Sequence, residues 1–235
     1  MRGRRPASSR DRAGPRCFLS TCGKTPSHFP LRMTNRLLLG TKNQGKLVEF
    51  RELLRGVRGV EFLTIAERPF ADVEETGETF LENALLKARA ICGETGLAVL
   101  AEDAGLDVAA LGGAPGVRSA RFSGEPVDYA RNNALLLERL RGVADRQARF
   151  VAVTALVLPS GDFFVTSGAL HGRIAQKAAG QGGFGYDPVF IPEGMVRTLA
   201  EIPLAEKNEI SHRRRSIARM TTLLATLERE GALSS

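Results

Sequence analysis

The stretch that decides the fold is RLLLGTKNQGKLVEF, residues 36–50. Its apolar run Leu37–Leu39 has the length of a buried strand and ends at Gly40. Apolar side chains then recur at helical spacing, at Leu47, Phe50 and Leu54, which predicts a helix over residues 46–55. A strand that passes through a short loop into a helix is the building unit of an α/β sheet.

The loop between this strand and helix reads Gly40-Thr41-Lys42-Asn43-Gln44-Gly45-Lys46. Backbone N–H groups at a helix N-terminus favour anions, and two lysines add positive charge. The spacing nearly matches a P-loop, but Leu47 stands where a P-loop has the hydroxyl that helps to hold magnesium. We therefore expect a triphosphate cradle whose metal is held elsewhere. A plain strand–helix turn with exposed lysines is the alternative.

The rest of the chain continues the alternation of strands and helices. The capping box Thr79-Phe80-Leu81-Glu82 opens a helix, and Leu97–Ala101 has the pattern of a short buried strand. A helix is expected from Glu125 to Leu140, and a last helix begins at its cap Ser211. Residues 150–158 and 163–170 flank the turn Pro159-Ser160-Gly161-Asp162, which indicates a hairpin. The sequence predicts an α/β fold with parallel crossovers and an antiparallel hairpin.

Composition excludes several classes of protein. Apolar stretches are interrupted well before the ~18 residues of a membrane-spanning helix, so we expect no membrane partner. Three Cys and three His without a C-x-x-C pair leave little material for a zinc site or a disulfide framework. A divalent metal is therefore expected on carboxylates, which suit magnesium.

The net charge of +7 suggests a nucleic-acid binder, but its distribution does not. Residues 1–32 hold eight of the 33 Lys and Arg residues and one of the 26 acidic residues. Residues 33–235 therefore keep 25 of each sign and are neutral overall. We expect no nucleic-acid partner.

Residues 1–32 also contain four prolines and almost no hydrophobic periodicity, so we expect a disordered basic extension. Two other interpretations stay open. An Arg/Ser-rich, acid-poor leader is typical of a transit peptide, and translation upstream of a true start at Met33 gives the same sequence.

Two acidic clusters are candidates for the chemistry. Glu74-Glu75 lies in a loop, and Glu102-Asp103 directly follows the strand 97–101. Acids at the carboxyl end of a buried strand face the crevice where open α/β sheets bind ligands. One carboxylate from each cluster, with phosphate oxygens, suits magnesium, and another carboxylate can orient or deprotonate a water. The alternative is a set of solvated loop and capping residues.

A second glycine loop, residues 180–185, formally satisfies G-x-G-x-x-G, but no helix pattern follows it, so we reject a dinucleotide fold. Phe184 and Tyr186 suit stacking on a flat base, and Asp187 can accept from a base edge; ordinary core packing is the alternative. Lys207 and the run His212–Arg215 place positive charge at a helix start. The helix dipole disfavours that placement, which indicates a bound anion or an electron-rich carbonyl, or else a solvated basic face.

Taken together, seven ordered motifs between residues 36 and 229 resemble the inosine triphosphate pyrophosphatase family. The motifs are Thr41-x-Asn43-x-x-Lys46, Glu75-Thr76-Gly77, Glu102-Asp103-x-Gly105-Leu106, Gly112-Gly113-Ala114-Pro115-Gly116, Ser119-Ala120-Arg121, Phe184-Gly185-Tyr186-Asp187-Pro188 and Ser211-His212-Arg213. The resemblance implies an elongated mixed β-sheet flanked by helices, with two lobes and a central cleft, formed by residues 33–235.

The resemblance also implies a magnesium-dependent enzyme that hydrolyses ITP, dITP and XTP to the monophosphate and diphosphate, works as a homodimer and lies in the cytoplasm. By match, Glu75 and Asp103 belong to the metal site and Asp103 is the proton acceptor. The implied substrate-binding residues are Thr41, Lys42, Asn43, Gln44, Gly45, Lys46, Ala104, Phe184, Gly185, Tyr186, Asp187, Lys207, His212 and Arg213.

Two departures from the family pattern stand in one motif. Glu102 replaces the usual Asp, and Ala104 replaces the usual Ser, so only the backbone of Ala104 is expected to contribute. A Maf-type nucleotide pyrophosphatase, which prefers other modified or pyrimidine nucleotides, is the alternative enzyme, and the motifs at 184–188 and 211–213 argue against it.

Overall fold

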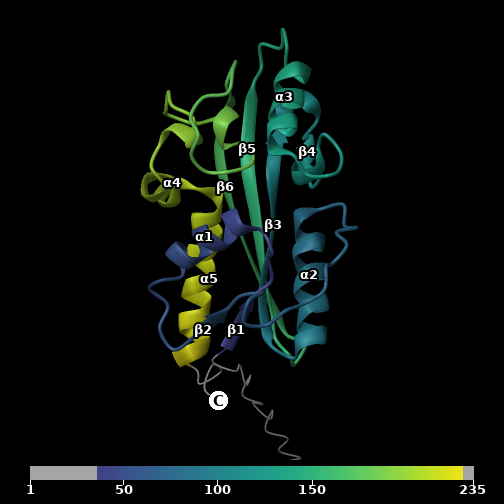
Figure 1. Ribbon diagram of the computed structural model, residues 1–235. Coiled ribbons are helices and arrows are strands. Elements are labelled where there is room, and N and C mark those ends of the chain that lie inside the picture. The colour runs from purple at the N-terminus through teal and green to yellow at the C-terminus, as the bar shows by residue number, and fades with distance from the viewer. Residues whose placement is uncertain (1–35, 230–235) are drawn as a thin grey trace, which may run out of the picture.

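The computed structural model describes residues 36–229, so the predictions for residues 1–32 lie outside the described part of the chain. Its helices and strands follow the predicted alternation (Figure 1). They are β1 (Arg36–Leu39), α1 (Gln44–Leu53), β2 (Glu61–Leu63), α2 (Phe80–Thr95), β3 (Ala98–Val108), β4 (Pro115–Gly116), α3 (Tyr129–Arg139), β5 (Gln147–Val157), β6 (Phe163–Ile174), β7 (Phe190–Pro192), α4 (Leu204–Ile210) and α5 (His212–Arg229).

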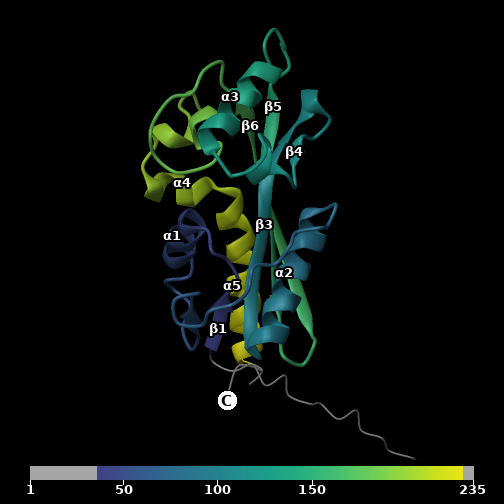
Figure 2. The ribbon, with the colours of Figure 1, turned by 45° about the vertical axis from the view of Figure 1, so that its right-hand side comes forward.

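The strands form one mixed sheet in the order β2-β1-β3-β5-β6-β7, and β4 pairs with β3. The pairs of β1 with β2 and with β3 are parallel, and all the others are antiparallel. Figures 1 and 2 show that β3, β5 and β6 run the length of an elongated molecule, with α1, α2 and α5 around one half and α3, α4 and β4 in the other. The predicted α/β fold with an elongated mixed sheet is confirmed.

Alternation of side chains along the strands separates two cores in the half that contains α2. Leu37, Leu39 and Leu100 pack with α1 and α5 on one face of the sheet. Leu38 and Val99 pack with α2 on the other face. A third core, around Leu136 and Phe190, fills the half that contains α3. Because successive side chains of a strand point to opposite faces, Glu102 faces α1 and α5 while Asp103 faces α2.

Local signals explain where the helices begin. The capping box of Thr79 and Glu82 is present, and Ser211 Oγ accepts from the N–H of Arg214 at 3.0 Å. The third helix begins later than expected, at Tyr129, because Asp128 caps it by accepting from the N–H of Arg131. Within residues 36–229, no helix is long and apolar enough to cross a membrane.

The strand predicted at residues 97–101 is β3, which is longer than predicted, and its length corrects the interpretation of its two acidic residues. β3 continues for eleven residues to Val108, so Glu102 and Asp103 lie in its middle and not at its carboxyl end. Both are buried, at 1% and 4% exposure. What exposes their backbone to ligands is the shortness of the neighbouring strand: β1 pairs with β3 only as far as Leu100, and β4 resumes the pairing at Leu106.

Candidate active site

The interruption in pairing along β3, at residues 101–105, forms the floor of a cleft between the two halves. The Glu102 carbonyl points into this interruption and accepts from two ammonium groups, Lys46 Nζ at 3.3 Å and Lys87 Nζ at 2.9 Å. Lys46 arrives from α1 and Lys87 from α2, on opposite faces of the sheet. The unpaired segment thus brings two positive charges together at one backbone oxygen.

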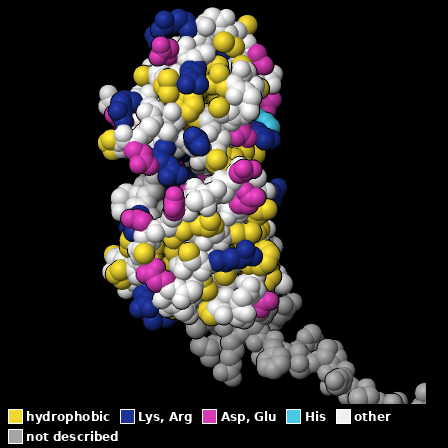
Figure 3. Space-filling view, turned by 90° about the vertical axis from the view of Figure 1, so that its right-hand side faces the viewer, with side chains coloured by type: hydrophobic (Ala, Val, Ile, Leu, Met, Phe, Trp, Pro, Cys, Tyr) yellow, Lys and Arg dark blue, Asp and Glu magenta, His cyan; other side chains and the backbone are white. Residues whose placement is uncertain are grey.

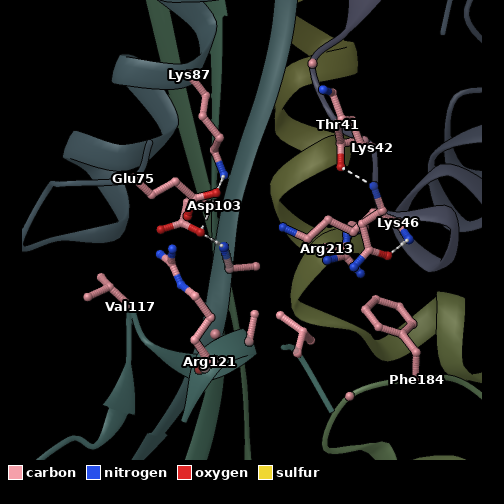
Figure 4. A pocket seen from close by; sticks show the side chains of 18 of the residues that line it. Thr41, Lys42, Lys46, Glu75, Lys87, Asp103, Val117, Arg121, Phe184 and Arg213 are labelled. Atoms are coloured by element: carbon pink, nitrogen blue, oxygen red, sulfur yellow. Dashed lines mark hydrogen bonds and ion pairs between the residues drawn. The ribbon is translucent and has the colours of Figure 1, made fainter. Parts of the chain in front are cut away.

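On the α2 side, two carboxylates flank Lys87. Its Nζ lies 3.1 Å from Glu75 Oε1 and 3.6 Å from Asp103 Oδ1 (Figure 4). Asp103 Oδ1 also accepts from the N–H of Ala104 at 2.9 Å. Asp103 Oδ2 is buried and has no hydrogen-bond partner among residues 36–229. Burial raises the pKa of Asp103 above its usual value, against the opposing effect of the Lys87 and Lys46 charges. The two predicted metal-site residues therefore lie together.

On the opposite face, six charged side chains alternate in sign through the interior. In order they are Lys46, Glu102, Arg213, Glu49, Lys207 and Asp187. Lys46 Nζ lies 3.3 Å from Glu102 Oε1, and Arg213 Nη2 donates to the same oxygen at 2.7 Å. Arg213 also donates to Glu49, and Lys207 Nζ lies 2.7 Å from Glu49 Oε1 and 2.5 Å from Asp187 Oδ2.

The neighbours of each group set its pKa in this chain of charges. Burial alone would raise the pKa of Glu102, but Arg213 and Lys46 outweigh it and hold the pKa at about 2. Burial lowers the pKa of Lys46 despite Glu102. Burial raises the pKa of Asp187 although Lys207 opposes the change. A buried carboxylate and a buried guanidinium persist here because each has hydrogen-bonded partners of opposite sign.

These contacts correct the interpretation of the basic helix start. Arg213 is 2% exposed, and carboxylates of this chain, rather than a ligand, provide its principal counter-charge. Lys207, also 2% exposed, is likewise paired. Their hydrogen bonds leave further N–H groups on each, because an ammonium has three donors and a guanidinium five. Asp187 Oδ2 accepts from Lys207 and from the N–H of Phe184, so it positions the aromatic loop.

Phe184 lies where the predicted phosphate loop meets the predicted base site. A Cβ built on Gly45 would come within 2.6 Å of its ring, so glycine at position 45 allows the close approach. Lys207 Nζ lies 5.0 Å and Arg213 Cζ 5.7 Å from the ring centroid. Figure 4 shows Phe184 across the cleft from Glu75 and Asp103.

Tyr186 and His212 behave differently from Phe184. Tyr186 is 3% exposed and its hydroxyl donates to the Ser119 carbonyl at 2.9 Å, so it packs in the core beside the cleft. His212 stacks on Phe150, with ring centroids 4.7 Å apart, and its buried Nδ1 has no partner in the described part of the chain. Burial lowers the pKa of His212 well below its usual value, so the imidazole is neutral.

The predicted phosphate loop, residues 40–46, is ordered by its own side chains. Thr41 Oγ1 accepts from the N–H of Asn43, and Asn43 Oδ1 caps α1 by accepting from the N–H of Lys46 at 3.0 Å. Lys42 pairs with Asp72 at 2.7 Å and lies over the Phe70 ring. Both lysines of this loop line the cleft, and a role in phosphate binding stays a prediction.

A cavity of about 650 Å³ joins these groups and has the size of a small-molecule site. Figure 3 shows side chains of both charge signs crowded at mid-height, between the two halves. All but two of the predicted site residues line the cavity; Gln44 and Gly45 do not.

Four residues of the site were missed by sequence reasoning. Glu49 lies in α1 and Lys87 in α2, each among apolar residues that pack on the sheet, so a charged residue within such a stretch was the available signal. Arg121 lay within a recognised motif without a role, and its side chain points toward Glu75 and Asp103 from the other half (Figure 4). Tyr129, which lines the cavity, gave no signal.

Fold and site together define an elongated α/β protein with a cleft lined by clustered lysines, arginines and carboxylates. The chain belongs to the Ham1 family, whose model matches residues 37–223. It is 51% identical over 199 residues to a dITP/XTP pyrophosphatase of Symbiobacterium thermophilum, covering 83% of this chain and 98% of the relative. It is 48% identical to one of Mycolicibacterium paratuberculosis, covering 82% of this chain and 97% of the relative.

Solved structures agree with the fold. A Ham1 protein from Coxiella burnetii is 40% identical, with a TM-score of 0.75 over 81% of this chain and 98% of that chain. The Ham1 protein of Staphylococcus aureus is 38% identical, with a TM-score of 0.74 over the same shares. The family inferred from the seven motifs is thereby confirmed.

Proposed function

We propose that this protein is a nucleoside triphosphate pyrophosphatase that hydrolyses dITP, ITP and XTP to the monophosphate and diphosphate. The observation that carries the proposal is the juxtaposition on β3: Glu75 and Asp103 meet at Lys87, and Lys46 shares the Glu102 carbonyl with Lys87. Carboxylates beside clustered lysines suit the attack of water on a phosphate whose oxygens need neutralisation. The close relatives named above support the substrate class.

The residues present fit a hard divalent cation. Asp103 Oδ2 is a buried acceptor without a partner in residues 36–229, and the half-buried Glu75 carboxylate lies beside it. No cluster of three or more His, Cys, Asp or Glu occurs in the described range, so substrate phosphate oxygens would complete the coordination. We propose Glu75 and Asp103 as ligands of Mg²⁺, which when bound supplies charge neutralisation at the phosphates.

The protein groups have distinct tasks in this proposal. Asp103 accepts the proton of the attacking water, a role for which its place beside Glu75 and Lys87 at the floor of the cleft is suited. Lys46 and Lys87 hold the phosphate oxygens from opposite faces of the sheet. Arg121 approaches from the far wall of the cleft (Figure 4) and adds positive charge. Diphosphate then leaves from the α-phosphorus.

Base selection rests on fixed donors. Lys207 and Arg213 are oriented by Glu49, so their remaining N–H groups have defined directions. These donors pair with the 6-keto oxygen of hypoxanthine or xanthine and face the amino group of adenine unfavourably. A donor left unpaired costs about 1–3 kcal/mol, or one to two decades per contact.

We also propose a cytoplasmic homodimer. Phe163 and Val165 on β6 are 48% and 37% exposed and offer an apolar surface to a second copy. Light scattering after size exclusion tests this part, with twice the chain mass expected and a single chain mass against it.

The activity is tested by diphosphate release from ITP, dITP, XTP, ATP and GTP, with and without Mg²⁺. We expect ITP, dITP and XTP to exceed ATP by about ten- to a hundredfold in kcat/KM and to require the metal. Equal rates for ITP and ATP, or release of single phosphates, would contradict the proposal.

A further inference from the structure

Tyr129 lies at the junction between the phosphate loop and the aromatic loop. It is the first residue of α3, in the half of the molecule opposite α1. Asn43 Nδ2, from the loop before α1, donates to Tyr129 Oη at 3.0 Å across the cleft. The half-buried side chain of Tyr129 lines the same cavity as Lys46 and Phe184.

The position of this hydroxyl is well defined. Asn43 Oδ1 is committed to the N–H of Lys46, which fixes the orientation of the amide and directs Nδ2 to Tyr129. The ring of Tyr129 lies 6.3 Å from that of Phe184, with the planes tilted by 54°. Rings at this distance and tilt contact each other directly, so no flat base fits between them. Tyr129 is therefore not the second side of a base sandwich.

Tyr129 contacts both the phosphate loop, through Asn43, and the aromatic loop, through Phe184. It therefore lies beside the part of the ligand that joins the phosphates to the base. In a nucleoside triphosphate that part is the sugar. Tyr129 Oη accepts from Asn43, and within residues 36–229 no acceptor is bonded to its own proton. A phenol has one donor in addition to its acceptor positions, so this donor is available to a sugar hydroxyl.

We propose that Tyr129 is a specificity-determining residue that reads the sugar: its hydroxyl donates to a sugar hydroxyl of the bound nucleotide while Asn43 holds it in place. The inference rests on the proposed function, because it needs the base near Phe184 and the phosphates near Lys46. It adds to that function a preference for nucleotides that retain a sugar hydroxyl over those that have none.

The test is a cycle of two changes, one in the protein and one in the substrate. Tyr129→Phe removes the phenolic oxygen, and 2′,3′-dideoxy-ITP lacks both sugar hydroxyls. We expect the unmodified protein to prefer ITP over the dideoxy substrate by about three- to tenfold in kcat/KM, the worth of one hydrogen bond. In Tyr129→Phe the two substrates should differ by less than about twofold.

The chain contains one other tyrosine, which provides a matched control. Tyr186→Phe removes a hydroxyl that donates to the Ser119 carbonyl, and it should leave the ratio of ITP to dideoxy-ITP as in the unmodified protein. Circular dichroism verifies that both variants are folded.

Two results would overturn the inference. One is no preference for ITP in the unmodified protein. The other is an unchanged ratio in Tyr129→Phe; if both substrates then lose activity equally, Tyr129 acts only through Asn43. Failure of the unmodified protein to release diphosphate from ITP would instead overturn the proposed function itself.

Discussion

Asp103 combines burial with an unsatisfied acceptor, and this makes it the sharpest single-residue test of the chemistry. In Asp103→Asn the side chain keeps its size but loses its charge and most of its basicity. We expect kcat for ITP to fall by about 10²–10⁴-fold, the usual contribution of a positioned general base. Diphosphate release measures the loss, and thermal melting shows whether the fold is kept.

Asp107→Asn is the matched control for this substitution. Asp107 lies on the same strand and the same face as Asp103, but it pairs with Arg149 at 3.0 Å on the surface. Asp107 does not line the cavity, and such pairs contribute only about 0–1 kcal/mol to stability, so turnover should change by less than about twofold. Similar losses of turnover in both variants would show that the activity depends on the total negative charge of β3 and not on Asp103 itself.

Glu102 gives a prediction on stability against pH. Its pKa is about 2 in the folded protein, against a usual value of 4.5, because Arg213 and Lys46 stabilise the carboxylate more than burial disfavours it. Glu102 therefore contributes stability that is fully present above about pH 4.5 and is lost as the pH falls toward 2. The difference between the two pKa values corresponds to about 3 kcal/mol at this one site.

Urea unfolding between pH 5.5 and pH 3 measures this contribution. Glu102→Gln should be less stable than the unmodified protein at pH 5.5, and its stability should fall less steeply toward pH 3. Glu206→Gln, which changes an exposed pair with Arg197, should keep the original slope. A slope unaffected by the Glu102 substitution would place the acid sensitivity elsewhere.

Residues paired across long sequence distances show the limit of sequence reasoning at this scale. Asp103, Lys46 and Phe184 were predicted from local motifs, and all three line the cavity. The ion pairs of Arg213 were not predicted, because its partners Glu49 and Glu102 lie 164 and 111 residues away in the sequence. The helix dipole disfavours a cation at that position, but two buried carboxylates compensate, and no local pattern reveals them.

At the scale of elements, the same contacts explain why β3 was predicted too short. Its apolar run stops at Ala101, and a polar pair normally ends a buried strand. Here Glu102 is neutralised by Arg213 and Lys46, so the strand continues through the cleft to Val108. Helix starts were predicted well where a capping side chain was available, as at Thr79 and Ser211.

The packing of α5 on β6 allows a prediction about an element. A Cβ at Gly168 would meet the His212 carbonyl and, at 2.6 Å, the Ser216 nitrogen. Gly168→Ala should push away the start of α5, which carries His212 and Arg213. We expect a loss of about 1–3 kcal/mol in unfolding free energy and reduced turnover of ITP.

Ser167→Ala serves as the control, since the Ser167 side chain is exposed and only its carbonyl binds α5, through Arg219. Urea unfolding and diphosphate release of both variants give the comparison. Full stability and turnover in Gly168→Ala would mean that α5 shifts without cost.

At the scale of the whole molecule, the excess basic charge and the residues proposed for the site occupy different parts of the sequence. Residues 1–32 carry the excess charge, while every residue proposed for the site lies between Thr41 and Arg213. The family match begins at residue 37, and the matched part covers 97–98% of the first two relatives described above. A chain that starts at Met33 should therefore retain kcat/KM for ITP within about twofold, since it keeps every residue proposed for the site.

Binding to a labelled single-stranded oligonucleotide tests whether the protein binds nucleic acid, as its net charge of +7 suggests. The shortened chain has no net charge, so we expect no salt-dependent binding by fluorescence anisotropy at 50 mM salt. If the full chain binds while both chains hydrolyse ITP equally, nucleic-acid binding is a property of residues 1–32 alone. A loss of hydrolysis of tenfold or more on removal of residues 1–32 would instead show that this segment contributes to the cleft.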